Sequence, residues 1–215
     1  MSLAITHFVS NDLDRIRSGQ PVVLLLHGYG ANEQDLPDLM NFLPELPWAA
    51  LRAPIALGYG AFAWHSITTP LNPSLDDVEP ATAAIWDWVE QNIPDESQMI
   101  VLGFSQGGLM ATQLLRTRPE RVAATVILAG FIFGGEQPAD AELKTLKPKV
   151  FYGRGVDDER ITREAVKSLN VWLQAHARAQ TKTYEGLGHS IDQRVMTDVA
   201  AFLENHLGHA ALHEL

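Results

Sequence analysis

The stretch Met99-Ile100-Val101-Leu102-Gly103-Phe104-Ser105-Gln106-Gly107-Gly108 decides the fold of this chain. Its first four residues form a short apolar run typical of a buried strand, and apolar residues at helical spacing follow it up to Leu115. A serine placed where a strand turns directly into a helix is held out on a sharp turn. The glycines at 103 and 107 let the strand and the helix approach closely, because neither carries a Cβ. Ser105 is therefore the first candidate nucleophile.

Similar apolar runs, each bounded by turn residues, recur along the chain. They cover residues 22–26, 49–53, 99–103, 123–129, 150–152 and 181–184, with a further strand expected near residues 5–9. Because these runs are short and apolar on both faces, we expect buried strands of a parallel sheet. Between them, residues 81–89, 166–177 and 191–202 show helical spacing. The alternation predicts one domain over residues 1–215, a doubly wound, mostly parallel α/β sheet of about six or seven strands.

Two further segments carry signals for the start of a helix. Ser190 and Gln193 have the spacing of a capping box, and Asn32 precedes two acids that suit the positive end of a helix. We therefore expect a helix to begin at each place. Residues 57–76 form the one long irregular stretch, and loops of that length are more often binding loops than spacers.

The composition excludes several classes of protein. With 46% hydrophobic and 20% charged residues the chain can bury a sizeable core, and its net charge of −10 argues against binding to nucleic acid. The absence of cysteine removes disulfides, thiolate metal sites and a cysteine nucleophile. Neither a secretory signal nor an apolar run long enough to span a membrane is visible. We expect a soluble, cytoplasmic protein without stable membrane insertion. The sequence does not decide whether it forms a homodimer.

A serine hydroxyl needs a base, and the base needs an orienting carboxylate. Both types of residue follow later strands, since Asp157 and Asp158 come after residues 150–152 and His189 comes after residues 181–184. The carboxyl ends of parallel strands meet at one edge of the sheet, so these side chains are expected to converge on Ser105. His189 is the predicted base. Only one of the two adjacent acids can face the imidazole, and the residue pattern leaves this choice open.

Hydrolysis through a serine also requires two backbone amides for the developing oxyanion. We expect them at Gln106, which opens the helix, and at Tyr29, in the glycine-rich loop after the first buried strand. The same loop does not fit a dinucleotide-binding motif, because Glu33 occupies the position of the third glycine. Neither proton transfer nor oxyanion stabilisation calls for a cofactor or a metal, so none is expected. The three C-terminal histidines, at 206, 209 and 213, are interpreted as solvated rather than as metal ligands.

Taken in order, these motifs resemble those of the carboxylesterase/phospholipase branch of the α/β-hydrolases, which includes acyl-protein thioesterases. The resemblance rests on Leu25-Leu26-His27-Gly28-Tyr29-Gly30, the loop around Trp64, Gly103-Phe104-Ser105-Gln106-Gly107-Gly108, Gly153-Arg154-Gly155-Val156-Asp157-Asp158 and Gly188-His189. It implies an α/β-hydrolase fold without a large cap. In the family the aspartate usually lies three residues after a glycine that corresponds to Gly155, so the resemblance favours Asp158.

The resemblance also indicates where the acyl group binds. It implies an apolar acyl site lined by the residues Phe62, Trp64, Phe131 and Ile132. Many relatives place an aspartate shortly after the aromatic residue that corresponds to Trp64, whereas this chain continues with His65 and Ser66. A substrate contact from that acid is therefore not carried over.

Together the residues and the resemblance predict a serine hydrolase that cleaves carboxylic esters or thioesters of short to medium acyl chains through an acyl-enzyme. Its partner is a small-molecule substrate. A lysophospholipase or an acyl-protein thioesterase is the alternative among enzymes. A non-catalytic module that binds a small ligand on the same fold is the alternative from another class.

Overall fold

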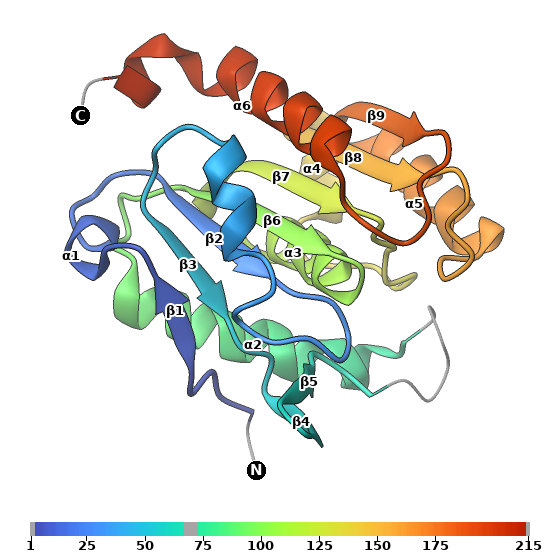
Figure 1. Cartoon of the computed structure of the whole chain (residues 1–215), viewed down its shortest axis with the longest axis horizontal. Coiled ribbons are helices and arrows are strands. Elements are labelled where there is room, and N and C mark those ends of the chain that lie inside the picture. The colour runs from blue at the N-terminus through green and yellow to red at the C-terminus, as the bar shows by residue number, and fades with distance from the viewer. Residues whose placement is uncertain (1–2, 67–72, 214–215) are drawn as a thin grey trace.

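The computed structural model describes residues 3–66 and 73–213, with side chains up to residue 205. The protein is built around a seven-stranded sheet (Figure 1). The strand order is β1-β3-β2-β6-β7-β8-β9. All neighbouring strands are parallel except β1 and β3, which confirms the predicted sheet. The strands are β1 (Phe8–Ser10), β2 (Val22–Leu26), β3 (Trp48–Leu51), β6 (Met99–Phe104), β7 (Val122–Leu128), β8 (Lys149–Gly155) and β9 (Arg178–Tyr184).

Helices cover both faces of this sheet. The long helices are α2 (Leu75–Asn92), α3 (Gln106–Thr117), α5 (Arg163–His176) and α6 (Gln193–His213). Alternate residues of β2 belong to different clusters: Leu24 packs with α2, α3 and α5, whereas Val23 and Leu25 pack with α6. Figure 1 shows α6 on the opposite side of the sheet from α2 and α3. Burial on both faces is the reason that β2 is an unbroken apolar run.

Four short helical segments were not indicated by the sequence pattern. They are α1 (Leu13–Ile16), α4 (Asp140–Leu146) and the 3-10 segments η1 (Pro37–Phe42) and η2 (Pro119–Arg121). Each is at most seven residues long, which is about two turns of an α-helix and too short to establish a 3.6-residue period.

The two predicted helix starts are wrong. The carboxylate of Asp192, rather than Ser190, accepts a hydrogen bond from the amide of Val195 at 3.1 Å, and α6 begins one residue after it. No α-helix begins at Asn32, because its side chain closes a local turn by accepting from the amide of Gln34. Asparagine often satisfies nearby amides in this way at the expense of a helix. A capping box does occur at Ser74, where α2 begins earlier than its apolar spacing indicates.

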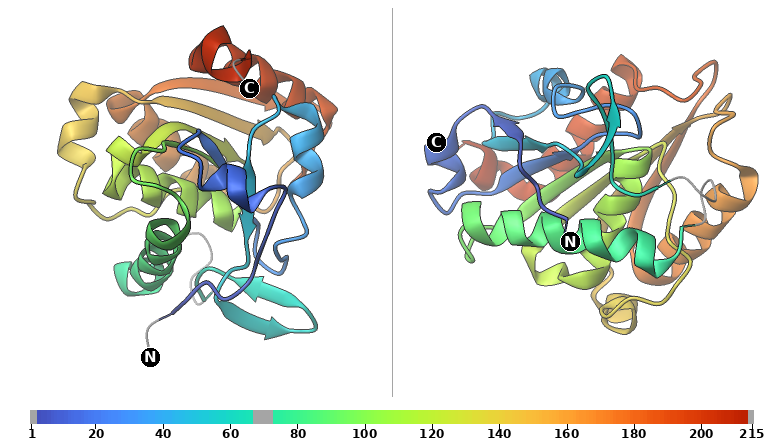
Figure 2. Two further views of the ribbon diagram at one scale, coloured as in Figure 1. Left: turned by 90° about the vertical axis from the view of Figure 1, so that its left-hand side faces the viewer. Right: turned by 90° about the horizontal axis from the view of Figure 1, so that it is seen from below.

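The predicted irregular stretch 57–76 is wrong over its first part. Residues Ile55–Gly58 (β4) and Ala61–Ala63 (β5) form an antiparallel hairpin, which projects from the body of the protein in the left view of Figure 2. Its two loop residues, Tyr59 and Gly60, both have positive φ, as the tight hairpin turn requires. The middle of the stretch, residues 67–72, lies outside the described residues.

The last strand is also not buried as expected. Of the β9 residues, only Tyr184 is buried, because β9 is the edge strand and pairs with β8 alone. Its register against β8 still brings Tyr184 beside Gly155, so the loops that follow the two strands leave the sheet together.

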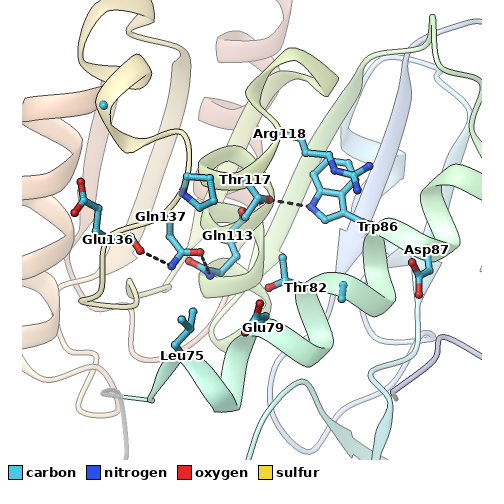
Figure 3. A pocket seen from close by; sticks show the side chains of 13 residues that line it. Leu75, Glu79, Thr82, Trp86, Asp87, Gln113, Thr117, Arg118, Glu136 and Gln137 are labelled. Carbon is cyan, nitrogen blue, oxygen red and sulfur yellow. Dashed lines mark hydrogen bonds between the residues drawn. The ribbon is translucent and has the colours of Figure 1, made fainter. Parts of the chain in front are cut away.

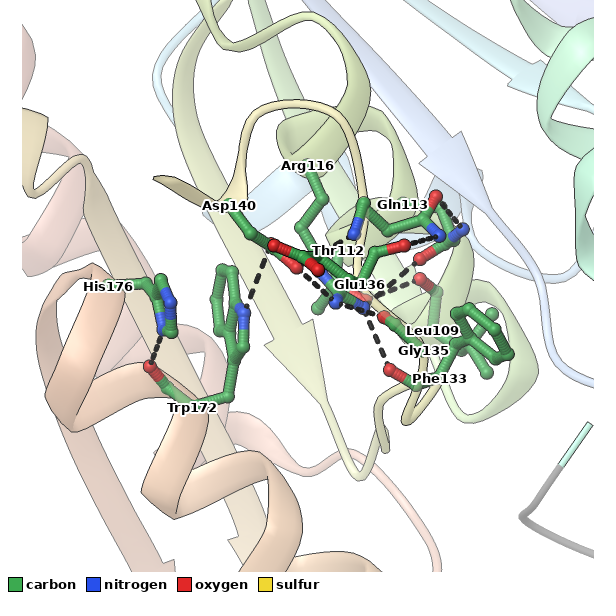
Figure 4. Close-up of polar contacts among 11 residues, drawn as sticks. Leu109, Thr112, Gln113, Arg116, Phe133, Gly135, Glu136, Asp140, Trp172 and His176 are labelled. Atoms are coloured by element: carbon green, nitrogen blue, oxygen red, sulfur yellow. Dashed lines mark hydrogen bonds and ion pairs between the residues drawn. The ribbon is translucent and has the colours of Figure 1, made fainter. Parts of the chain in front are cut away.

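A buried ion pair holds the segment that follows β7. The guanidinium of Arg116 in α3 binds both carboxylate oxygens of Asp140 at 2.8 and 2.7 Å, and it also donates to the carbonyls of Phe133 and Gly135 (Figure 4). Burial raises the pKa of Asp140, but the hydrogen bonds from Arg116, the amide of Gln137 and Trp172, together with the positive charge of Arg116, outweigh it and hold this pKa below its usual range. The pair therefore ties the chain downstream of Phe131 to the helix that follows Ser105.

We expect Arg116→Met to lower the free energy of unfolding by about 3–5 kcal/mol, because it leaves Asp140 charged, buried and unpaired. Urea denaturation at neutral pH measures the change. Arg118→Met removes an exposed pair with Glu90 and is expected to cost about 1 kcal/mol or less. Equal effects of the two substitutions would contradict this role of Arg116.

Candidate active site

Ser105 lies in a strained turn between β6 and α3. Its φ of 55° and ψ of −116° are unusual for a residue other than glycine. The turn is fixed on both sides, since the amide of Ser105 donates to the carbonyl of Leu128 and its carbonyl accepts from the amides of Gly108 and Leu109. The strained backbone directs the hydroxyl away from the helix that it begins.

The flanking glycines are required by close backbone contacts. A Cβ on Gly103 would lie 2.0 Å from the carbonyl oxygen of Gly107, and a Cβ on Gly107 would lie 1.9 Å from that of Leu26. No larger residue fits at either position. The loop after β2 also approaches the serine, because a Cβ on Gly28 would lie 3.4 Å from the Cβ of Ser105.

Three side chains from separate loops form a hydrogen-bonded chain at this turn. The Oγ of Ser105 is 2.9 Å from Nε2 of His189, and Nδ1 of His189 is 2.8 Å from Oδ2 of Asp158. Because the carboxylate accepts from Nδ1, the proton of a neutral imidazole resides there and Nε2 is left to accept from the serine hydroxyl. The arrangement brings together the three residues that the sequence singled out as nucleophile, base and carboxylate.

The loop after β8 distinguishes the two adjacent acids. The Asp158 side chain is fully buried, and its Oδ1 accepts from the amides of Arg160 and Ile161 at 2.8 and 3.2 Å. Asp157 is exposed, and its backbone amide donates to the carbonyl of Leu187. Of the two acids, only Asp158 contacts the imidazole of His189. The imidazole ring also contacts the ring of Phe104, at a centroid distance of 4.9 Å.

The side chain of Gln106 joins the turn to the segment after β5. Its Oε1 accepts from the amide of Trp64, and its Nε2 donates to the carbonyl of His65, both at 2.8 Å. The indole of Trp64 in turn donates to the carbonyl of His27. These bonds hold three chain segments together around Ser105. Trp64 therefore has a structural role that could not be predicted from the residues around it in the sequence.

His27 links the glycine-rich loop after β2 to the segment after β3. Its Nε2 accepts from the amide of Ala53 at 3.0 Å, so Nδ1 carries the proton and donates to the carbonyl of Gly28. Burial lowers the pKa of His27, which keeps the imidazole neutral and suited to this accepting role.

The amides of Tyr29 and Gln106 are available at the site. Within residues 3–66 and 73–213, neither N–H donates to any acceptor, although both residues line the pocket that contains Ser105. Gln106 is the first residue of α3, where the helix leaves its amides unpaired and the helix dipole favours negative charge.

The pocket at Ser105 has a volume of about 450 Å³. Its lining residues are Gly28, Tyr29, His65, Phe104, Ser105, Gln106, Phe131, Arg160, Ile161 and His189. Of the four residues expected to line an acyl site, Phe131 alone is among them. Trp64 is fully buried in the core, Ile132 is packed into the same core, and Phe62 stacks on the guanidinium of Arg52. Aromatic character in a loop does not distinguish a pocket wall from core packing.

Two polar residues of this pocket were missed by the sequence reasoning. Burial lowers the pKa of His65, whose Nδ1 donates to the carbonyl of Ser66. Arg160 lies two residues after Asp158 in the same loop. Its proximity to the predicted carboxylate was the available signal, but the direction in which a loop side chain points cannot be read from sequence.

A second hollow of about 700 Å³ lies between α2, α3 and residues 136–141 (Figure 3). Its described lining includes acids, glutamines and Trp86, whose indole donates to Thr117, but neither serine nor histidine. It therefore lacks a nucleophile and base pair of the kind found at Ser105. No group of histidines and acids among residues 3–66 and 73–205 is arranged to bind a metal, and the side chains of His206, His209 and His213 lie outside this description.

The mostly parallel sheet, the strained serine turn after β6 and the Ser-His-Asp contacts define an α/β-hydrolase. A sequence model described as phospholipase/carboxylesterase matches residues 14–207. The chain belongs to this family, as the sequence motifs indicated.

Individual relatives agree with this assignment. A probable carboxylesterase of rice (Oryza sativa subsp. japonica) is 28% identical over 206 residues, which cover 86% of this chain and 77% of the relative. Acyl-protein thioesterase 1 of Candida albicans is 26% identical over 219 residues, with coverage of 87% and 93%. The solved structure of a Bacillus cereus carboxylesterase has the same fold, with a TM-score of 0.76, 20% identity and 93% coverage of both chains.

The class of reaction predicted from the sequence, cleavage of a carboxylic ester or thioester by a serine hydrolase, is therefore confirmed. Among the described residues, no helix combines the length and apolar character needed to cross a bilayer.

Proposed function

We propose that this protein is a carboxylesterase that acts on esters or thioesters of short to medium acyl chains through an acyl-enzyme. Ser105 is the nucleophile, His189 the general base and acid, and Asp158 the residue that orients the imidazole. The observation that carries this proposal is the continuous hydrogen-bonded chain from Ser105 through His189 to Asp158 at the wall of a pocket.

The reaction follows from the positions of these groups. Ser105 passes its proton to Nε2 of His189 while Oγ bonds to the carbonyl carbon, and the amides of Tyr29 and Gln106 bind the oxyanion. Collapse of the tetrahedral intermediate expels the alkoxide or thiolate, which takes the proton from Nε2. Water then repeats the sequence on the acyl-enzyme, releasing the acid and restoring Ser105.

The pocket supports a limit on acyl-chain length. Its volume of about 450 Å³ lies in the lower half of the range for small-molecule sites, and its apolar wall consists of Phe104, Phe131 and Ile161. A chain of a few carbons can be enclosed by such a wall, whereas a long lipid chain would extend beyond it.

The test is a series of p-nitrophenyl esters with acetyl, butyryl, hexanoyl, octanoyl and palmitoyl groups. We expect kcat/KM to be highest for butyryl to octanoyl esters and at least about 10-fold lower for palmitoyl. The acyl thioesters of a small thiol, followed with a thiol reagent, measure the preference between ester and thioester. A steady rise of kcat/KM up to palmitoyl would contradict the proposed chain length and favour the lysophospholipase alternative.

The alternatives are separated by two further measurements. A fluorophosphonate probe should label Ser105, and a folded protein that fails to react would favour the non-catalytic binding module. The similarity to acyl-protein thioesterase 1 of Candida albicans supports testing a palmitoylated peptide beside the small esters. Turnover of aryl esters without turnover of peptides would exclude a peptidase.

We also propose that the protein acts in the cytoplasm on small molecules, without stable membrane insertion and without nucleic acid as a partner. The net charge of −10 supports the last two parts of this proposal, because it disfavours contact with phosphate backbones and anionic lipid. Size-exclusion chromatography with light scattering would decide between a monomer and a homodimer.

A further inference from the structure

We propose that Arg160 binds an anionic group of the substrate, so that this hydrolase prefers esters that carry a carboxylate or a phosphate. The inference rests on the proposed function, since it adds a specificity to the pocket at Ser105. Arg160 is exposed and lines that pocket together with Ser105 and His189.

The backbone at Arg160 is anchored to the triad itself. Its amide donates to Oδ1 of Asp158 at 2.8 Å, and the next amide, that of Ile161, donates to the same oxygen at 3.2 Å. The Oδ2 atom of this carboxylate binds His189. The Cα of Arg160 therefore keeps a fixed position relative to the reacting groups, and the residue lines the pocket without any movement of the chain.

The guanidinium of Arg160 has no partner within the described part of the chain. Although Asp157 and Glu159 are close in sequence, no described carboxylate lies within 4.0 Å of it, and no described side chain or carbonyl accepts a hydrogen bond from it. Arg163 and Arg178 are also exposed without a described side-chain partner, but of these three arginines only Arg160 lines the pocket at Ser105. An exposed arginine that lines a pocket, with no described partner for its guanidinium, is available to a ligand.

The charge of the pocket adds a second observation. Arg160 is the one lysine or arginine among the described lining residues, and none of those residues is an aspartate or glutamate. The low pKa of His65 keeps that wall uncharged near neutral pH. In a protein with a net charge of −10, an unpaired cation at this place marks the point where an anion can approach.

The chemistry of the guanidinium defines the ligand class. Its planar fork matches the two oxygens of a carboxylate or a phosphate, and both anions would be bound by parallel N–H···O hydrogen bonds. The anion can belong to the acyl part of the ester or to its alcohol part. These two sources place the charge on opposite sides of the scissile bond and can be separated by the choice of substrate.

The test compares substrates that differ only in charge. Mono-p-nitrophenyl adipate carries a carboxylate at the end of a six-carbon acyl chain, and p-nitrophenyl hexanoate carries a methyl group there. The hexanoyl ester of a carboxylated p-nitrophenol places the charge on the leaving group instead. Each is measured with the wild-type protein, with Arg160→Gln and with Arg163→Gln, which removes an equal charge from an exposed position outside the pocket.

We expect Arg160→Gln to lower kcat/KM for one of the two anionic esters by about fivefold, mainly through KM, and to change the neutral ester by less than about twofold. Arg163→Gln should leave all three unchanged within about twofold. The anionic ester that responds identifies the side of the substrate that Arg160 binds. Competitive inhibition by adipate and by phenyl phosphate, each weakened in Arg160→Gln, identifies the preferred oxyanion.

Equal changes for charged and neutral esters, or equal effects of the two substitutions, would overturn the inference. The proposed function would survive that result, because turnover of p-nitrophenyl hexanoate depends on Ser105 and not on Arg160. Failure of the wild-type protein to hydrolyse any of the three esters would instead contradict the proposed function itself.

Discussion

Ser105→Ala is expected to lower kcat for p-nitrophenyl butyrate by about 10⁴-fold or more. Without Oγ there is no atom to form the acyl-enzyme, and the imidazole of His189 loses the hydroxyl that it contacts at 2.9 Å. KM should change little, since the amides of Tyr29 and Gln106 and the wall at Phe131 remain in place. Steady-state kinetics on the purified variant measure both constants.

The matched control is Ser190→Ala, next to His189 in sequence. Ser190 is exposed, and its amide rather than its hydroxyl is engaged, in a hydrogen bond to the carbonyl of Gly188. Its replacement should keep kcat within about twofold of the wild-type value. Activity of Ser105→Ala equal to that of Ser190→Ala would refute the assignment of the nucleophile.

Asp158→Asn is expected to reduce kcat by about 10⁴-fold while the protein stays folded. The amides of Arg160 and Ile161 both donate to Oδ1, so the carbonyl of an asparagine would occupy that place and its NH₂ would face Nδ1 of His189. The imidazole would then carry its proton on Nε2, where it could no longer accept the proton of Ser105. Pre-steady-state acylation rates would locate the loss in the chemical step.

Asp157→Asn provides the comparison, because it makes the same change of charge one residue away. Asp157 is exposed, and the structure gives its side chain no contact with the triad, so kcat should stay within about twofold. The reverse pattern, with a large loss for Asp157→Asn and little for Asp158→Asn, would show that the loop adopts another arrangement in solution.

Most of the sheet could be predicted because buried parallel strands are continuous apolar runs. Residues 22–26 were predicted with their observed limits, and the strands that flank them were placed within about two residues. Helix starts were less predictable, because several polar residues compete to cap the same end. Asp192 displaced Ser190 in this competition, and the turn closed by Asn32 replaced a helix altogether.

Some residues of the candidate site could likewise be predicted from the sequence, and others could not. Chain order after successive strands was enough to bring Ser105 and His189 together, since the carboxyl ends of parallel strands share one edge of the sheet. Sequence pattern alone could not choose between Asp157 and Asp158. The choice depends on which side chain the turn directs inward, and the three hydrogen bonds to Asp158 are made by residues of that turn and by His189.

The residues predicted to line the acyl site show most clearly what could not be predicted from the sequence. The sequence gives no way to tell apart the three aromatic residues Phe131, Trp64 and Phe62. In the structure, Phe131 lines the pocket, Trp64 is buried in the core and Phe62 stacks on Arg52. Arg160 carried no sequence signal beyond its position after Asp158, and only the geometry of the loop makes it a lining residue of the pocket.

By itself the sequence determined the α/β sheet, the serine turn and the histidine that contacts the serine, because these depend on local apolar runs, on glycines without a Cβ and on chain order. The tertiary structure alone decided which acid contacts the histidine, which of the predicted aromatic side chains lines the pocket and where an unpaired arginine lies beside it. Those outcomes depend on the directions of side chains in loops. Such directions are fixed by hydrogen bonds and packing between segments that are distant in the chain.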